Sequence, residues 1–401
     1  MISEQPTLSV SGLERRLKRH FLKEIHTFRL HCAIGFEQTL CEQILTLPIE
    51  SEVCAQERGF IEVKTSLDWM YWAHLNLTIP TRIFLVVASF KAFHFSELYN
   101  KSARIPWELY LGFQKKYSIN VRSEASELNM LQRIADTVSQ TIDYSMRDLG
   151  CQTQCADKAD IAFIVSLYHD VVNIRIHCSG DLLHMRGYRK APAFAPLRET
   201  LAASMIAKYC PVAPPVLWDP CVGSGTLLIE AMRLWASVPQ SRSFAYEHWP
   251  SFQKSKFLRF KAESAQKSSQ KFPQILTKFV GSDLSPEAIS AARINVQRQI
   301  ENCELSENNL CQNKLHFSDC GVIISNWPYG KRAASHVDVV ALYSKLIQSL
   351  SVFVGWRFIL MIPHEKSLLS LFQKSGSFHI MSTTYTENGG LDVLVIAGDI
   401  R

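Results

Sequence analysis

Hydrophobic positions near the start of the chain recur with a helical period. Leu13, Leu17, Phe21 and Ile25 are spaced four residues apart. That spacing places them on one face of an amphipathic helix. The opposite face is rich in arginine and lysine, and both a solvated surface and an RNA contact remain open for it.

The next segment alternates between short apolar runs and helical patterns. The runs at 28–32, 60–63 and 83–90 predict strands, and the patterns at 36–47 and 66–77 predict helices. This β-α-β-α-β order is typical of a small ferredoxin-like unit.

A second α+β segment follows. Strands are predicted at 115–122, 161–167 and 171–177, with a helix at 131–149 between the first two. His169-Asp170 predicts a tight turn between the last two strands. A basic loop, Arg186-Gly187-Tyr188-Arg189, and a helix at 197–209 then lead towards a change of pattern.

From Val216 the chain follows the order strand, glycine loop, helix, strand, acid, helix, strand. This order predicts an open, mostly parallel, doubly wound α/β sheet. A buried strand at 358–362 and a hairpin of 379–386 with 391–397, turning at Asn388-Gly389-Gly390, complete it. The lysine-rich stretch 254–278 has few apolar positions in register and predicts a surface helix or insertion.

Composition narrows the class of protein. The 401 residues suggest two or three domains at roughly 100–200 residues each. A hydrophobic share of 47% supports real cores, and the net charge of +6 fits a polyanionic partner as well as an ordinary enzyme. Eleven dispersed cysteines argue against a disulfide framework or zinc module, and the apolar runs are too short to span a bilayer. We therefore expect a cytoplasmic, metal-free protein without a membrane segment.

A glycine loop directly follows the short apolar strand at 216–218. Its glycines allow close backbone approach to a ligand, and the helix that follows offers free amide donors. The spacing matches neither GxGxxG nor GxxxxGK[ST], which disfavours a dinucleotide or a P-loop site. An entering Asp-Pro suits a cofactor with an amino group, although a plain strand–helix turn remains an alternative. The candidate cofactor residues of the loop are Asp219, Cys221, Gly223, Ser224, Gly225 and Thr226.

An acid ends the next predicted strand. Asp283 follows Phe279-Val280-Gly281-Ser282, and Leu284 and Ser285-Pro286 lead into a helix. A carboxylate at this position can accept hydrogen bonds from a ribose diol. A helix cap is the alternative, and the glycine loop upstream favours the ribose role.

A third strand, at 322–325, delivers Asn326-Trp327-Pro328-Tyr329 to its carboxyl end. An exocyclic base amine is a poor nucleophile because its lone pair is delocalised into the ring. The Asn326 side-chain oxygen and a nearby backbone carbonyl can accept its N–H groups and stabilise the growing positive charge. Pro328 stiffens the turn, and the Tyr329 ring can stack on an extruded base. An ordinary turn with core aromatics is the alternative.

These segments together resemble the THUMP-domain-containing class I RNA methyltransferases, in particular the guanine-N2 enzymes that act on large-subunit rRNA and on tRNA. The resemblance extends from about residue 27 to the Asn-X-Pro-Tyr-Gly segment. The segments specific to this group are Arg-Gly-Tyr-Arg at 186–189 and Ala-Pro-Leu-Arg-Glu-Thr at 195–200. The loop at 219–226 and the Phe-Ala-Tyr-Glu-His-Trp-Pro run at 244–250 also belong to the resemblance.

The resemblance implies three domains after the amphipathic extension at 1–26. They are a ferredoxin-like domain at 27–92, a THUMP RNA-binding domain at 93–180 and a Rossmann-like methyltransferase domain with a seven-stranded sheet at 181–401. S-adenosyl-L-methionine is the implied cofactor, structured RNA (rRNA, then tRNA) the implied partner, and a monomer the expected state. Adenine-N6 methylation and an RNA-binding assembly factor with weak catalysis remain alternatives.

The sequence departs from the family pattern at two places. Trp327 stands where relatives have a proline. The segment before residue 323 is short, so Asp319 is the acid available there for the adenine side of the cofactor.

Overall fold

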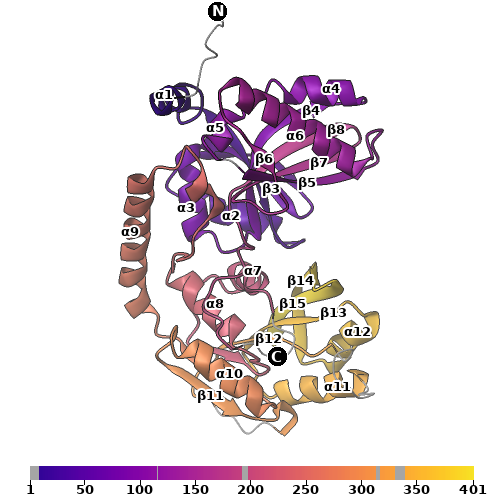
Figure 1. Ribbon diagram of the computed structural model, residues 1–401. Coiled ribbons are helices and arrows are strands. Elements are labelled where there is room, and N and C mark those ends of the chain that lie inside the picture. The colour runs from indigo at the N-terminus through magenta and orange to yellow at the C-terminus, as the bar shows by residue number, and fades with distance from the viewer. Residues whose placement is uncertain (1–8, 115, 192–196, 313–316, 330–338) are drawn as a thin grey trace, which may run out of the picture.

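The computed structural model describes residues 9–114, 116–191, 197–312, 317–329 and 339–401, arranged around two β-sheets (Figure 1). Some predicted segments lie partly outside these ranges: residues 1–8 of the amphipathic extension, residue 115 of a strand, residues 195–196 of a family segment and residue 330 of the Asn-X-Pro-Tyr-Gly segment. The first sheet uses the chain up to residue 177 and the second uses residues 216–400. Each sheet has its own hydrophobic core.

The first sheet has eight strands in the order β2-β3-β1-β4-β8-β7-β5-β6. Their bounds in chain order are β1 Ile25–His31, β2 Ser51–Glu57, β3 Phe60–Ser66, β4 Arg82–Lys91, β5 Lys116–Glu124, β6 Gln154–Cys155, β7 Ile161–Tyr168 and β8 Val171–His177. Strands β5, β6 and β7 are mutually parallel, and the other pairs are antiparallel.

The predicted ferredoxin-like unit is present with one more strand than the sequence pattern indicated. Helices α2 (Glu37–Ile44) and α3 (Leu67–Asn76) and strands β1 to β4 form a βαββαβ unit. The missed strand, β2, is polar and lies at the sheet edge, so no apolar run marks it. Strand β4 pairs with β8, so segments 27–92 and 93–180 share one continuous sheet.

The remaining helices of this half are α1 Val10–His20, α4 Phe95–Ser102, α5 Glu108–Leu111 and α6 Leu131–Asp148. Leu13 and Leu17 of α1 are buried as predicted, but the helix ends at His20, and Ile25 is an exposed residue at the start of β1. The predicted turn between β7 and β8 is confirmed, with positive φ at His169 and Asp170.

The second sheet has seven strands in the order β11-β10-β9-β12-β13-β15-β14. Their bounds are β9 Val216–Asp219, β10 Lys278–Asp283, β11 Cys303–Glu307, β12 Val322–Asn326, β13 Arg357–Pro363, β14 Phe378–Asn388 and β15 Leu391–Ile400. Six of these strands run in one direction, and β15 runs in the opposite direction between β13 and β14. The order reverses at β9 and β12, which is where doubly wound sheets bind ligands at the carboxyl edge.

Helices flank this sheet and connect it to the first half. They are α7 Glu199–Tyr209, α8 Thr226–Trp235, α9 Lys254–Lys271, α10 Pro286–Val296, α11 Val339–Leu350 and α12 Lys366–Ser375, with short 3-10 turns at Ala245–His248, Phe272–Gln274 and Leu310–Gln312. The predicted lysine-rich surface helix is α9, which runs along the outside of both halves (Figure 1). Lys256 of α9 pairs with Asp68 of α3 at 2.8 Å.

A buried ion pair joins the two halves. Arg186 Nε donates to Glu230 Oε1 of α8 at 3.0 Å, and Arg186 Nη2 donates to the Thr78 carbonyl at 2.6 Å. Both charged side chains are almost fully buried. The basic loop predicted at 186–189 therefore has a structural role at its first arginine.

Candidate active site

The glycine loop connects β9 to α8 at the carboxyl edge of the second sheet. Gly223 and Gly225 have φ of +52° and +84°, the left-handed region that glycine adopts without strain. A Cβ on Gly225 would lie 2.7 Å from Val296 of α10, whereas one on Gly223 would meet nothing within 4 Å. Gly225 thus packs against the protein, and the backbone at Gly223 is open to a ligand.

Asp219 ends β9 as a buried carboxylate, with 1% of its surface exposed. Its Oδ1 accepts from Ser325 Oγ at 2.9 Å and from the Cys221 amide at 3.1 Å. Burial raises the pKa of Asp219 to about 7, against the lowering effect of these two donors. A cationic group brought next to Asp219 would favour the charged carboxylate.

The loop side chains mostly hold the loop in place. Ser224 and Thr226 are buried, and their hydroxyl oxygens are 3.3 Å apart. Arg189 Nη2 donates to Thr226 Oγ1 at 2.9 Å. Burial raises the pKa of the Cys221 thiol, so this side chain stays neutral at physiological pH.

Asp283 lies at the end of β10 beside the same loop. Its Oδ2 accepts from the Gly223 amide at 2.9 Å, and its Oδ1 accepts from the Ser285 amide at 3.0 Å. Each carboxylate oxygen has a further lone pair for a ligand hydroxyl. Leu284 is 68% exposed next to it and offers an apolar surface at this edge.

Asn326 ends β12, which pairs with β9, so it lies on the strand next to the glycine loop. The Tyr329 hydroxyl donates to Asn326 Oδ1 at 2.6 Å, and Asn388 Nδ2 donates to the Tyr329 oxygen at 3.0 Å. Pro328 is exposed, and its carbonyl accepts from Tyr343 at 3.2 Å. Asn326 Oδ1, which is expected to accept from a base amine, thus accepts from the Tyr329 hydroxyl instead.

The side chain of Trp327 points away from this edge. It is 1% exposed and packs edge-on against Tyr343 of α11 and beside Phe372 of α12. Its amide donates to the Met361 carbonyl of β13 at 3.1 Å. The indole therefore packs in the core. A tryptophan in place of the family proline does not fill the space above Asn326.

Asp319 does not join the residues at the carboxyl edge. Gly321, two residues later, lies against Val216, and its carbonyl accepts from the Arg357 amide. Val216 and Arg357 are the first residues of β9 and β13, so the chain enters β12 from the amino edge. Asp319 is exposed there, which corrects the expected adenine-side position.

Three asparagines that the sequence reasoning did not single out support the site. The Asn308 amide donates to the Asp283 carbonyl at 2.9 Å, directly after β11. Asn295 of α10 accepts from Lys190 and Ala191 and donates to the Ser224 carbonyl. Asn388 contacts Tyr329. Its place directly after β11 was a signal for Asn308. Asn388 was predicted only as part of a turn, and no local pattern marks Asn295.

Groups of metal-binding side chains are absent from the described ranges. All eleven cysteines lie within those ranges and are unpaired. The same ranges contain no helix with both the length and the apolar composition needed to cross a bilayer.

Comparison with known proteins adds a family. The sequence model of UPF0020 (RMKL-like, methyltransferase domain) matches residues 186–394. The ribosomal RNA large subunit methyltransferase K/L of Psychromonas ingrahamii is 31% identical over 332 residues, which are 80% of this chain and 44% of that protein. This chain spans about half the length of the curated relatives it matches.

Solved structures agree over most of the chain. A protein from Clostridium difficile 630 described as a "possible methylase" superposes with a TM-score of 0.82 at 27% identity, covering 94% of this chain and 99% of that one. TrmN from Thermus thermophilus superposes with a TM-score of 0.69 at 15% identity, covering 94% and 100%, which speaks for the fold alone.

Proposed function

This chain belongs to the UPF0020 family of RMKL-like methyltransferase domains, and we propose that it methylates the exocyclic N2 amine of a guanine in structured RNA, with S-adenosyl-L-methionine as donor. Ribosomal RNA is our first choice of substrate because curated relatives are named for it, and tRNA is the second. We further propose that residues 27–92 and 93–180 act as ferredoxin-like and THUMP parts of one RNA-binding region. We also propose that the protein is cytoplasmic and monomeric.

One observation carries this proposal: the candidate donor site and the candidate amine acceptor lie on adjacent strands. Ser325 of β12 donates to Asp219 of β9, and Asn326 is the next residue. A ligand above Gly223 and a base held at Asn326 would therefore meet at the same edge of the sheet. Catalysis by positioning requires this proximity. Orienting two reactants can lower the activation free energy by several kcal/mol, of order 7–11 kcal/mol at the upper end.

Four residues would hold the cofactor. Asp219 pairs with an amino group, the backbone at Gly223 approaches the ligand, Asp283 accepts from a ribose diol and Leu284 covers an apolar ring. The segment after β11, at Asn308, takes the adenine-side position in place of Asp319 because it lies beside Asp283. When bound, the cofactor supplies an electrophilic methyl group on a sulfonium.

Asn326 and the Trp327 carbonyl would accept the two N–H groups of the guanine amine. These acceptors become more effective as positive charge develops on nitrogen, so they stabilise the transition state more than the bound substrate. The nitrogen forms its bond to the methyl carbon as the carbon–sulfur bond breaks, and the nitrogen then releases one proton to water. Tyr329 must release or share Asn326 Oδ1 as the base enters, and its ring is then placed to stack on that base.

Nucleoside analysis tests this proposal. Total RNA from cells lacking the protein serves as substrate for the purified chain and S-adenosyl-L-methionine, and the products are separated by mass spectrometry. We expect N2-methylguanosine, with Asn326→Ala reducing its rate by about 10²–10³-fold. Asn76→Ala is the matched control, since that amide contacts Trp72 and Ser264 far from the site.

Two results would contradict the proposal. Formation of N6-methyladenosine in place of N2-methylguanosine would move the target to adenine, which the Asn-X-Pro-Tyr chemistry also permits. Absence of calorimetric binding of S-adenosyl-L-methionine by the purified chain would favour an RNA-binding assembly factor of the same fold.

A further inference from the structure

One face of the first sheet is lined with basic side chains, whereas the other is packed into the core. Cross-strand partners place these side chains side by side, because residues in register project to the same face. The register pairs His31 with Arg82 between β1 and β4, and Phe84 with His177 between β4 and β8. Further along the sheet the pairs are Ile164 with Arg175 and Arg122 with Ser166.

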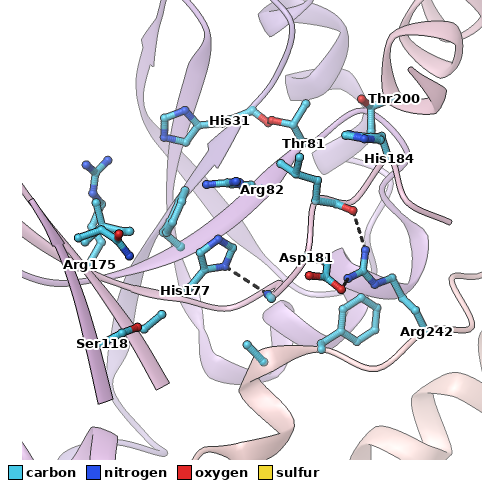
Figure 2. A pocket seen from close by; sticks show the side chains of 18 of the residues that line it. His31, Thr81, Arg82, Ser118, Arg175, His177, Asp181, His184, Thr200 and Arg242 are labelled. Atoms are coloured by element: carbon cyan, nitrogen blue, oxygen red, sulfur yellow. Dashed lines mark hydrogen bonds and ion pairs between the residues drawn. The ribbon is translucent and has the colours of Figure 1, made fainter. Parts of the chain in front are cut away.

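This face borders a cavity of about 1100 Å³ between the two halves of the molecule. Figure 2 shows Arg82 between His31 and His177, with Arg175 farther along the sheet. The opposite wall comes from the second half, including Arg198, Thr200 and Arg242. A cavity walled by both halves suits a ligand that contacts the first sheet while it reaches the second.

Three arginines on this face have no carboxylate partner. Arg82, Arg122 and Arg175 form no ion pair with any residue the structure describes. Arg175 is only 7% exposed and donates to Ser166 Oγ at 2.7 Å, while its Nε and that of Arg82 have no acceptor among the described residues. Leaving the buried Nε donors of Arg82 and Arg175 without acceptors is costly unless a ligand supplies an acceptor.

The carboxylates near these three arginines form no ion pairs with them among the described residues. Glu62 is engaged by Arg29 at 2.6 Å, and Asp181 lies 3.7 Å from Arg242. The remaining carboxylates of the cavity wall are Asp157, Asp160 and Glu387. Of these, Asp160 lies 3.9 Å from His248.

Burial keeps the histidines of this face neutral. His177 Nδ1 accepts from the Gly180 amide at 3.2 Å, so its proton is on Nε2. Burial, together with neighbouring arginines, lowers the pKa of His31 and His177 to about 4. Burial, together with Arg29 and Arg122 and against the effect of Glu62, lowers the pKa of Arg175 to about 10, which still leaves it charged at neutral pH.

We propose that Arg82, Arg122 and Arg175, the arginine floor, hold the phosphodiester backbone of the substrate RNA beside the nucleotide that is modified. The choice of RNA rests on the proposed function, whereas the choice of phosphate rests on the unpaired guanidinium groups. Arginine presents a planar fork of donors that matches phosphate oxygens. Phe84, an aromatic ring on this face, is buried and packs against His31 and His177, so it is not available for base stacking.

The cavity leads towards the candidate active site. Glu387 of β14 lines it, and the next residue, Asn388, contacts Tyr329. Thr200 lines it from α7, near the loop that holds Arg189 against Thr226. Asn326 itself does not line the cavity, so a strand of RNA lying on the floor would extend past Glu387 to present a neighbouring base to it.

Binding of a fluorescein-labelled RNA hairpin with a single-stranded tail tests the arginine floor by fluorescence anisotropy. Arg122→Gln is the primary variant because its side chain is exposed and its loss should leave folding intact. We expect Kd to rise by about tenfold, as for loss of one charged hydrogen bond. The slope of log Kd against log salt should fall by about 0.7 for one single-strand phosphate contact.

Lys254→Gln on the exposed start of α9 is the matched control, since it removes the same charge on the outside of the molecule. Equal weakening by both variants would overturn the proposal. Arg82→Gln provides a second variant, with thermal unfolding as its check on folding.

The anisotropy assay requires no methyl transfer, so its outcome is separate from that of the proposed function. If the protein is an active enzyme but Arg122→Gln leaves its RNA affinity unchanged, only the arginine floor is refuted. An inactive protein whose RNA affinity depends on Arg122 would overturn the proposed reaction alone.

Discussion

Replacing Asp219 with asparagine tests how the glycine loop holds its ligand. The carboxylate is buried, and its pKa is raised to about 7 because burial disfavours the charged form. If Asp219 pairs with the amino group of the cofactor, only the ionised carboxylate gives that ion pair. Binding of S-adenosylhomocysteine by the wild-type protein should therefore strengthen as pH rises towards 7.

The pKa of Asp219 sets the size of two pH effects, one on ligand binding and one on folding stability. About one pH unit below it, roughly nine in ten carboxylates are protonated, so the ligand Kd should be about tenfold higher than at the plateau. For folding the sign is opposite, because the native state binds more protons than the unfolded chain between pH 3.8 and about 7. Stability then falls as pH rises through this window, by roughly 4 kcal/mol for a shift of about three units.

Calorimetric titration with S-adenosylhomocysteine from about pH 5.5 to about pH 7.5, where the ligand amine stays protonated, measures the first effect. Asp219→Asn should bind more weakly and lose the pH dependence. Urea unfolding of both proteins measures the second effect, and the variant should be the more stable one above pH 7. A wild-type Kd that stays constant over this range, or a variant with the same pH dependence, would refute the ion pair.

Three further predictions concern the supports of the site. Glu230→Gln should lower the free energy of unfolding by about 3–5 kcal/mol, because it leaves the buried Arg186 unpaired; urea denaturation measures this. Gly225→Ala should both destabilise the chain and weaken binding of S-adenosylhomocysteine, since φ is positive and the added methyl group meets α10; unchanged thermal unfolding would contradict the packing. Asn388→Ala should alter kcat more than KM for RNA through its contact with Tyr329, and rescue by Asn388→Gln would separate a positioning role from a folding defect.

The elements that the sequence predicted well are those with a strong local pattern. The doubly wound order from Val216, the hairpin turning at Asn388-Gly389-Gly390 and the tight turn at His169-Asp170 are all present. Their signals are short: apolar runs, and glycines at positive φ. Strand β2 was missed because its pairing with β3, and no apolar run of its own, makes it a strand.

Candidate residues could be predicted where strand order alone places them. Asp219, Asp283 and Asn326 each end a parallel strand, so the topology brings them to one edge. Asp319 was misplaced because it precedes β12, and the residues before a parallel strand lie at the amino edge of the sheet, opposite Asp219, Asp283 and Asn326. The direction of the Trp327 side chain likewise depends on α11 and α12, which are distant in sequence.

The sequence by itself determined the half of this protein that carries the candidate active site, since a glycine loop, a strand-ending acid and an Asn-X-Pro-Tyr segment are each local patterns of a few residues. Only the tertiary structure decided what surrounds them. The arginine floor draws its three side chains from β4, β5 and β8, and Tyr329 is held by Asn388, 59 residues away. Such groups form through strand pairing and burial, which depend on contacts between distant segments and leave no local pattern.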